Sequence, residues 1–79
     1  MKVSLKPKVL KEKLARRNIS QNCFALKLKV SSGYMSQLFS GTRNPSPKLR
    51  GKILGALELD ENNFDDIFKI VVWYEIRNV

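Results

Sequence analysis

The stretch SQNCFALKLKVSSGYMSQLFSG, residues 20–41, decides the fold because it holds two short helical patterns with a tight connection between them. Ser20 and Ser31 are good N-cap residues, and Gly41 is the residue type best suited to a left-handed C-terminal cap. These caps and the spacing of the apolar residues predict two helices, over residues 21–28 and about 32–39.

The second of these helices has an apolar side and a polar side without charge. Its apolar residues, with a valine in the connection, would anchor it to a core: Val30, Met35, Leu38 and Phe39. The other side carries small or uncharged residues: Ser32, Gly33, Ser36 and Gln37. No charge lies between Ser31 and Thr42, although the chain has a net charge of +8. A solvated helix face usually carries Lys and Glu, so this neutral face needs an explanation.

Two short helices at a steep angle, joined by a turn of three or four residues, form a helix-turn-helix, whose second helix can enter the major groove of DNA. Ala25 is small where the two helices would cross, and Val30 would fill the turn. Small outward side chains would let the second helix lie deep in the groove, where Ser and Gln can hydrogen-bond to base edges. Gly33 costs roughly 1 kcal/mol of helix stability relative to Ala, and a close approach to a partner would explain that cost.

Outside this stretch, caps and apolar spacing predict three more helices. One spans about residues 6–17, a fourth begins at Pro47 after the cap residue Ser46, and a short fifth begins at Asp60 or Asn62. Five short helices with tight connections predict a compact all-α domain.

The last segment, FKIVVWYEIRNV, is rich in β-branched and aromatic residues, which favours a strand, although its apolar residues equally suit one or two more helical turns. A lone strand cannot satisfy its own backbone groups. It would need KVSL, residues 2–5, or the same strand from a second chain. We therefore expect a helical domain over residues 1–68 and a C-terminal extension over residues 69–79 that is a candidate dimerisation strand.

The charge is unevenly distributed along the chain. Residues 1–50 hold twelve lysines and arginines and a single acid, whereas residues 51–79 hold three basic and six acidic residues. An imbalance over fifty folded residues indicates a polyanionic partner, most often nucleic acid. Arg43, Lys29 and Lys48 flank the helix pair and are candidates for phosphate contacts. We interpret the basic residues of the first helix as solvated surface: Lys11, Lys13, Arg16 and Arg17.

The composition argues against an enzyme. Histidine is absent and Cys23 is the single cysteine, so there is no imidazole base, no Cys/His nucleophile pair and no internal disulfide. The acidic stretch DENNFDDIF does not fit a calcium loop, because Phe64 stands where an oxygen ligand is needed. We expect no catalytic site, no metal and no cofactor. Without an apolar run of about 18 residues or a secretory signal, we expect a cytoplasmic protein with no membrane partner.

The helix pair resembles the helix-turn-helix of the Cro/phage-repressor (XRE) family, whose usual shape is Ser/Thr-Gln, Ala, Val-Ser, Ile-Ser, Gly and then Pro-Ser. In this chain these positions are held by Ser20-Gln21, Ala25, Val30-Ser31, Met35-Ser36, Gly41 and Pro45-Ser46. The resemblance covers about residues 5–68. It implies a five-helix, lambda-repressor-like DNA-binding domain, usually dimeric and usually a transcriptional regulator.

By matching position, the resemblance also implies two sets of residues that contact double-stranded DNA. Facing the bases would be Ser32, Gly33, Ser36 and Gln37, with Gln21 meeting phosphate or a base. Near the phosphate backbone would be Tyr34, Ser40, Arg43 and Asn44, in addition to Lys29 and Lys48. Two positions depart from the pattern. Lys29 stands where the family often has Gly in the turn, so it would adopt a positive φ at some cost. Phe39-Ser40 stands where many members have Glu-Arg.

The expected function is therefore sequence-specific DNA binding by a repressor-like regulator that acts as a homodimer. Two alternatives use the same fold: a protein-interaction module without DNA readout, and an antitoxin that binds DNA and also a protein partner through its C-terminal segment. Trp73 and Tyr74 in that segment are candidates for such an interface or for a dimer seam, because aromatic residues are common interface anchors.

Overall fold

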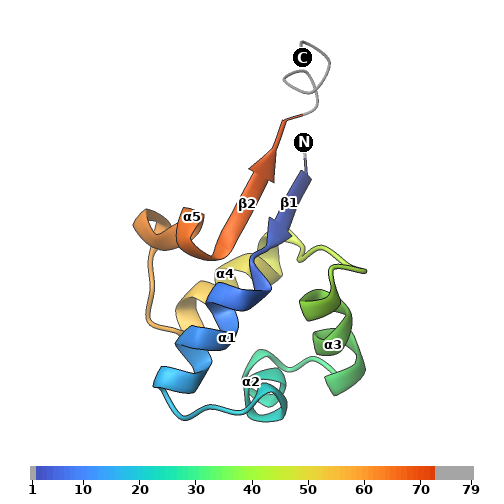
Figure 1. Cartoon of the computed structure of the whole chain (residues 1–79), viewed down its shortest axis with the longest axis vertical. Coiled ribbons are helices and arrows are strands. Elements are labelled where there is room, and N and C mark those ends of the chain that lie inside the picture. The colour runs from blue at the N-terminus through green and yellow to red at the C-terminus, as the bar shows by residue number, and fades with distance from the viewer. Residues whose placement is uncertain (1, 73–79) are drawn as a thin grey trace.

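The computed structural model describes residues 2–72, and within them the chain is mostly helical with one small sheet (Figure 1). The elements in chain order are β1 (Lys2–Leu5), α1 (Pro7–Arg16), α2 (Gln21–Leu28), α3 (Ser32–Ser40), α4 (Pro47–Ala56), the 3₁₀ turn η1 (Glu61–Asn63), α5 (Phe64–Ile67) and β2 (Phe68–Val71). The five expected helices are therefore present. The mostly helical class is thus confirmed, and two strands that pair at the ends of the described chain add a small sheet to it.

Local capping explains why the helices begin where they do. Ser20, Ser31 and Ser46 each adopt extended backbone, and each hydroxyl accepts a hydrogen bond from the backbone N–H three residues later, at 3.0 to 3.2 Å. Each bond satisfies one of the N–H groups that a helix start leaves free. At the other end of α3, which ends at Ser40 rather than Phe39, Gly41 has φ 83° and forms the left-handed cap that the sequence predicts.

The apolar residues of all these elements form one core. The side chains that are less than a tenth exposed are Val3, Leu5, Leu10, Leu14, Phe24, Ala25, Leu28, Met35, Leu38, Phe39, Leu49, Ile53, Leu57, Ile67 and Phe68. Leu49, Ile53 and Leu57 follow one another at intervals of four residues, so a single stripe of α4 faces the core, as the sequence predicts. Around this core, α2 packs against α1, α3 and α4, and α3 packs against α1 and α2.

The sheet shows that the start of the C-terminal segment is a strand and which strand it pairs with. β2 runs antiparallel to β1, with Leu5 opposite Phe68 and Val3 opposite Ile70. The predicted strand is thus confirmed over residues 68–71, and its partner is KVSL of the same chain. The pair projects beyond the helices (Figure 1), and Ile70 is 45% exposed. Trp73, Tyr74 and the rest of residues 73–79 lie outside the described part of the chain.

None of the helices within residues 2–72 is sufficiently long and apolar to cross a membrane.

Candidate nucleic-acid interface

The turn between α2 and α3 requires an unusual backbone conformation at Lys29. This residue has φ 60° and ψ 42°, the left-handed region that the resemblance implies at this position. The conformation costs a residue with a Cβ about 1–2 kcal/mol. The next N–H, that of Val30, donates to the carbonyl of Ala25 at 3.0 Å, and the Val30 side chain packs against the core. The reversal therefore takes only three residues, Lys29 to Ser31, before α3 begins.

α3 presents the two sides that its sequence predicts. Met35, Leu38 and Phe39 are buried, at 0%, 1% and 9% exposure. On the other side, spaced so that they share one helix face, the exposed residues are Ser32, Gly33, Ser36 and Gln37. None of the nine residues of α3 is charged. A methyl group added at Gly33 would meet nothing within 4 Å, so packing inside this chain does not require glycine there.

Gln21 joins the exposed face of α3 from the first position of α2. Its side-chain Nε2 donates a hydrogen bond to the Ser36 hydroxyl at 3.3 Å. The structure therefore brings together two residues that the resemblance implies as base-reading, although fifteen positions separate them in the sequence. The contact extends the polar face across the start of α2.

The loop after α3 folds back onto the helix. The backbone N–H groups of Thr42 and Arg43 both donate to the carbonyl of Gln37, at 3.0 and 3.3 Å, and the Ser40 hydroxyl donates to the same oxygen at 3.1 Å. The Arg43 guanidinium then lies over the ring of Tyr34, 5.7 Å from its centroid. Both residues were expected near the DNA backbone and they are in contact, while Asn44 follows in the same loop, exposed.

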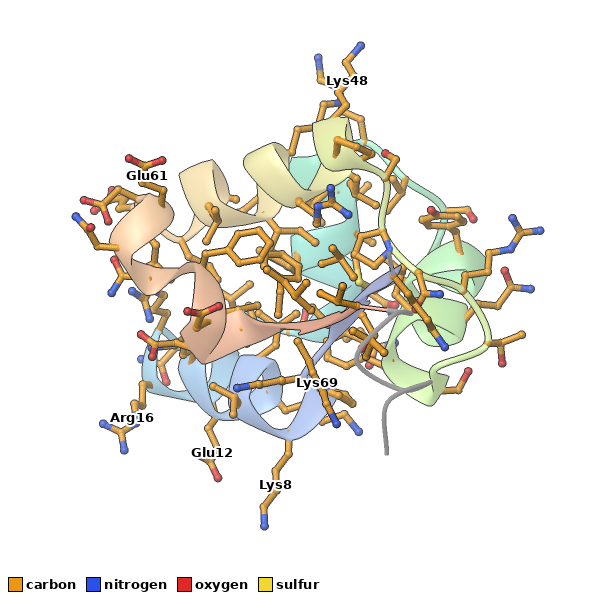
Figure 2. All side chains as sticks on the ribbon, turned by 90° about the horizontal axis from the view of Figure 1, so that it is seen from above. Lys8, Glu12, Arg16, Lys48, Glu61 and Lys69 are labelled. Carbon is orange, nitrogen blue, oxygen red and sulfur yellow. The ribbon has the colours of Figure 1, made fainter. Side chains whose placement is uncertain are left out.

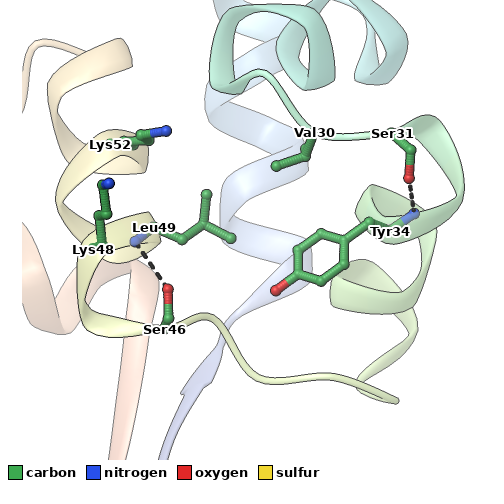
Figure 3. Close-up of a pocket in the computed structure, with 7 residues that line it drawn as sticks. All are labelled: Val30, Ser31, Tyr34, Ser46, Lys48, Leu49 and Lys52. Atoms are coloured by element: carbon green, nitrogen blue, oxygen red, sulfur yellow. Dashed lines mark hydrogen bonds between the residues drawn. The ribbon is translucent and has the colours of Figure 1, made fainter.

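A hollow of about 440 Å³ opens between the start of α3 and the start of α4 (Figure 3). Its lining combines the serine caps of α3 and α4 with Tyr34, two apolar residues and two lysines: Val30, Ser31, Tyr34, Ser46, Lys48, Leu49 and Lys52. Lys48 is one of the phosphate candidates that the sequence predicts beside the helix pair. Lys52 was not predicted, although its position four residues after Lys48 places both on one face of a helix, which is the signal that could have found it.

Lys29 lies on a second, smaller hollow of about 280 Å³ between the end of α2 and α4. Lys27 and Lys52 line the same hollow, so Lys52 belongs to both. The lysines around the α2–α3 turn and the first turns of α4 therefore form a continuous basic rim: Lys27, Lys29, Lys48 and Lys52. This basic rim borders the N-terminal end of α3.

Within residues 2–72, basic and acidic residues are concentrated in different parts of the chain. Residues 13–57, which contain all of α2, α3 and α4, include no Asp or Glu and nine lysines or arginines. Acids gather instead around η1 and α5, where Asp60 caps the 3₁₀ turn and Asp65 and Asp66 lie in the first turn of α5. Figure 2 shows Glu61 at this end and Lys48 at the start of α4. A polyanion would thus meet positive charge around α3.

Within residues 2–72 no group of three or more His, Cys, Asp or Glu side chains could hold a metal ion. Comparisons of the chain with protein-family models, with curated proteins and with solved structures find no match. The functional conclusion therefore depends on the arrangement of the residues themselves.

Proposed function

We propose that this protein binds double-stranded DNA in a sequence-specific manner and acts as a repressor-like transcriptional regulator, with α2 and α3 as a helix-turn-helix in a lambda-repressor-like fold. The observation that carries the proposal is the exposed face of α3. It is uncharged, small and rich in hydrogen-bonding groups, and it lies within a part of the chain, residues 13–57, that contains no acid.

The geometry suits a reading helix. The major groove is about 12 Å wide, and an α-helix with its side chains measures about 10–12 Å across, so bulky outward side chains would hinder deep entry. Serine and glycine keep this side of α3 narrow. Gln37 then supplies an amide that can pair bidentately with adenine, and Gln21 with Ser36 adds further donors and acceptors beside it.

The surrounding groups suit the phosphate backbone. Lysine and arginine contacts to phosphate give most of the sequence-independent affinity, whereas base-edge contacts select the site. In our proposal Arg43 and Tyr34 contact phosphate together with Ser40 and Asn44, and the basic rim contributes Lys29 and Lys48. Because residues around α3 contact the phosphates in this proposal, α3 itself needs no charge.

We further propose that the protein binds as a homodimer. β1 occupies one edge of β2, and the side of the sheet that holds the buried pair Leu5 and Phe68 continues outward to the exposed Ile70. A second copy at this end would cover Ile70 and would place two α3 helices on one duplex. Dimers of this kind read half-sites about one helical turn, roughly 34 Å, apart.

The test is selection of bound duplexes from a random-sequence pool, followed by affinity measurements on the selected duplex and on a scrambled duplex of equal length. We expect a two-fold repeat among the selected sequences and a steep fall of affinity with salt on both duplexes. Binding that does not respond to salt would contradict the proposal. Equal affinity for the two duplexes would instead favour a protein-interaction module on the same fold.

A further inference from the structure

α3 lacks charge, yet an ammonium group lies against its last turn. The Nζ atom of Lys11, which belongs to α1, lies over the ring of Phe39 at 5.5 Å from the centroid. Phe39 as a whole is only 9% exposed, and an ammonium over its ring is the geometry of a cation–π interaction. Phe39 therefore fixes a positive charge from another helix beside α3, at a position that no spacing in the sequence indicates.

This ammonium borders a third hollow, of about 270 Å³, lined by Lys11, Gln21, Ser36, Phe39 and Ser40. At 3.6 residues per turn, the exposed face of α3 lies between Phe39 on one side and Tyr34 on the other, and Tyr34 lines the hollow on the α4 side. The two hollows therefore flank the exposed face of α3 on opposite sides. Each contains at least one lysine amine and at least one serine hydroxyl.

We propose that Lys11 contacts a phosphate of the DNA strand that lies across α3 from the strand contacted by the basic rim, and that Phe39 is its positioning residue. This inference rests on the proposed function. A helix in the major groove has a phosphate backbone on each side, so a cation on each side adds to the affinity. The basic rim supplies one, and Lys11 supplies the other. Phe39 thus takes part in backbone binding without carrying a charge.

The experiment compares Lys11→Ala with Lys8→Ala, using the selected duplex and fluorescence anisotropy between about 50 and 200 mM salt. Lys8 is the matched control, since it lies one turn earlier on α1 and projects away from the body of the molecule (Figure 2). Loss of one phosphate contact lowers the slope of log affinity against log salt by about 0.9. Lys11→Ala should therefore reduce the salt-induced loss of affinity over this range by about 3.5-fold, whereas Lys8→Ala should leave it as in the native chain.

Equal slopes for Lys11→Ala and Lys8→Ala would overturn the inference while leaving the proposed function intact. Failure of the native chain to bind any duplex would overturn the proposed function itself. The two failures are thus distinguishable from the same set of titrations.

The role of Phe39 needs a readout that a loss of stability alone would not move. Phe39→Leu keeps an apolar side chain in the core but removes the ring face, so it should reproduce the slope change of Lys11→Ala, and adding Lys11→Ala to it should change the slope no further. Phe39→Tyr keeps the ring face and should restore the native slope. A native slope in Phe39→Leu would show that the ring does not position Lys11.

Discussion

Gln21 and Ser36 are joined by a hydrogen bond of 3.3 Å that links the first residue of α2 to the middle of α3. Both side chains face outward, and they are the point at which the two helices share one polar surface. If Gln21 and Ser36 contact the same DNA, their hydrogen bond also determines the orientation of the Gln21 amide toward the DNA.

The first prediction concerns this pair. Residues in contact show non-additive effects, with interaction energies of about 0.5–3 kcal/mol. We therefore expect Gln21→Ala and Ser36→Ala to weaken DNA binding individually and the double variant to lose less than the sum of both. A double-mutant cycle on affinity for the selected duplex measures this. Because the bond is exposed, the free energy of unfolding should change by under about 0.5 kcal/mol in each variant; strict additivity would contradict the coupling.

A second prediction separates base reading from phosphate contact. Gln37→Ala should cost about 1–3 kcal/mol at particular base pairs and little at others. Arg43→Ala should weaken binding to all sequences about equally and lower the salt slope by about 0.9. Affinities for a panel of duplexes, each changed at one base pair, distinguish the two patterns. An equal loss of affinity for every duplex of the panel in Gln37→Ala would contradict a base-reading role for Gln37.

Gly33 and Gly55 allow a third prediction with an internal control. Both lie in helices, and a methyl group at either would meet nothing within 4 Å. Each change to Ala should raise the free energy of unfolding by about 1 kcal/mol, measured by urea denaturation. Only Gly33→Ala should weaken DNA binding, because only Gly33 lies on the face proposed to enter the groove. Equal DNA affinity of the two variants would count against deep entry at Gly33.

The fourth prediction uses the left-handed backbone of Lys29. Lys29→Gly relieves the cost of a Cβ at φ 60°, so it should stabilise the fold by about 1 kcal/mol and at the same time reduce the salt slope by about 0.9. Glu58 has nearly the same φ, 58°, on the acidic side of the molecule. Glu58→Gly should give a similar gain in stability, measured by thermal denaturation, without loss of DNA affinity. If Lys29→Gly keeps the salt slope of the native chain, Lys29 does not contact phosphate.

The fifth prediction addresses the dimer. A truncation after Phe68 would remove the C-terminal segment, but it would also remove Val71, which pairs with Lys2 in the sheet of the same chain. A point substitution tests the dimer interface without breaking this pairing. Ile70→Asp should convert a native dimer into a monomer in sedimentation experiments at equal protein concentration, because a buried, unpaired carboxylate at a strand interface is costly. Lys69→Ala, whose side chain lies on the opposite face of β2, should leave the mass unchanged. An unchanged mass for Ile70→Asp would argue against this interface.

The helix pair could be read from the sequence because its signals are local. Ser20, Ser31 and Gly41 act within three residues of their own positions, and the structure places each of them at the helix end that it predicts. The positive φ of Lys29 follows instead from the resemblance, because the family often has Gly at this position of the turn.

Contacts between elements that are far apart in the sequence could not be predicted. Lys11 looks like any solvated lysine until the fold brings it over Phe39, twenty-eight positions later. The partner of β2 was likewise undecided, because KVSL and a second copy of the strand offer the same backbone groups. The composition of the strand determines that it needs a partner, and only tertiary structure determines which one.

The pairing of β1 with β2 has a consequence for how the chain folds during synthesis. Lys2 lies opposite Val71, so β1 leaves the ribosome long before its partner has been translated. α1 shares this delay, because it packs against α5, whereas α2 packs against α3 and α4, which follow it more closely in the sequence. Contacts between such distant positions also form slowly, since a large loop must close first. The sheet and the packing of α1 on α5 therefore form only after the C-terminal part of the domain has been made, and until then KVSL is an unpaired strand that a chaperone or a neighbouring nascent chain could bind.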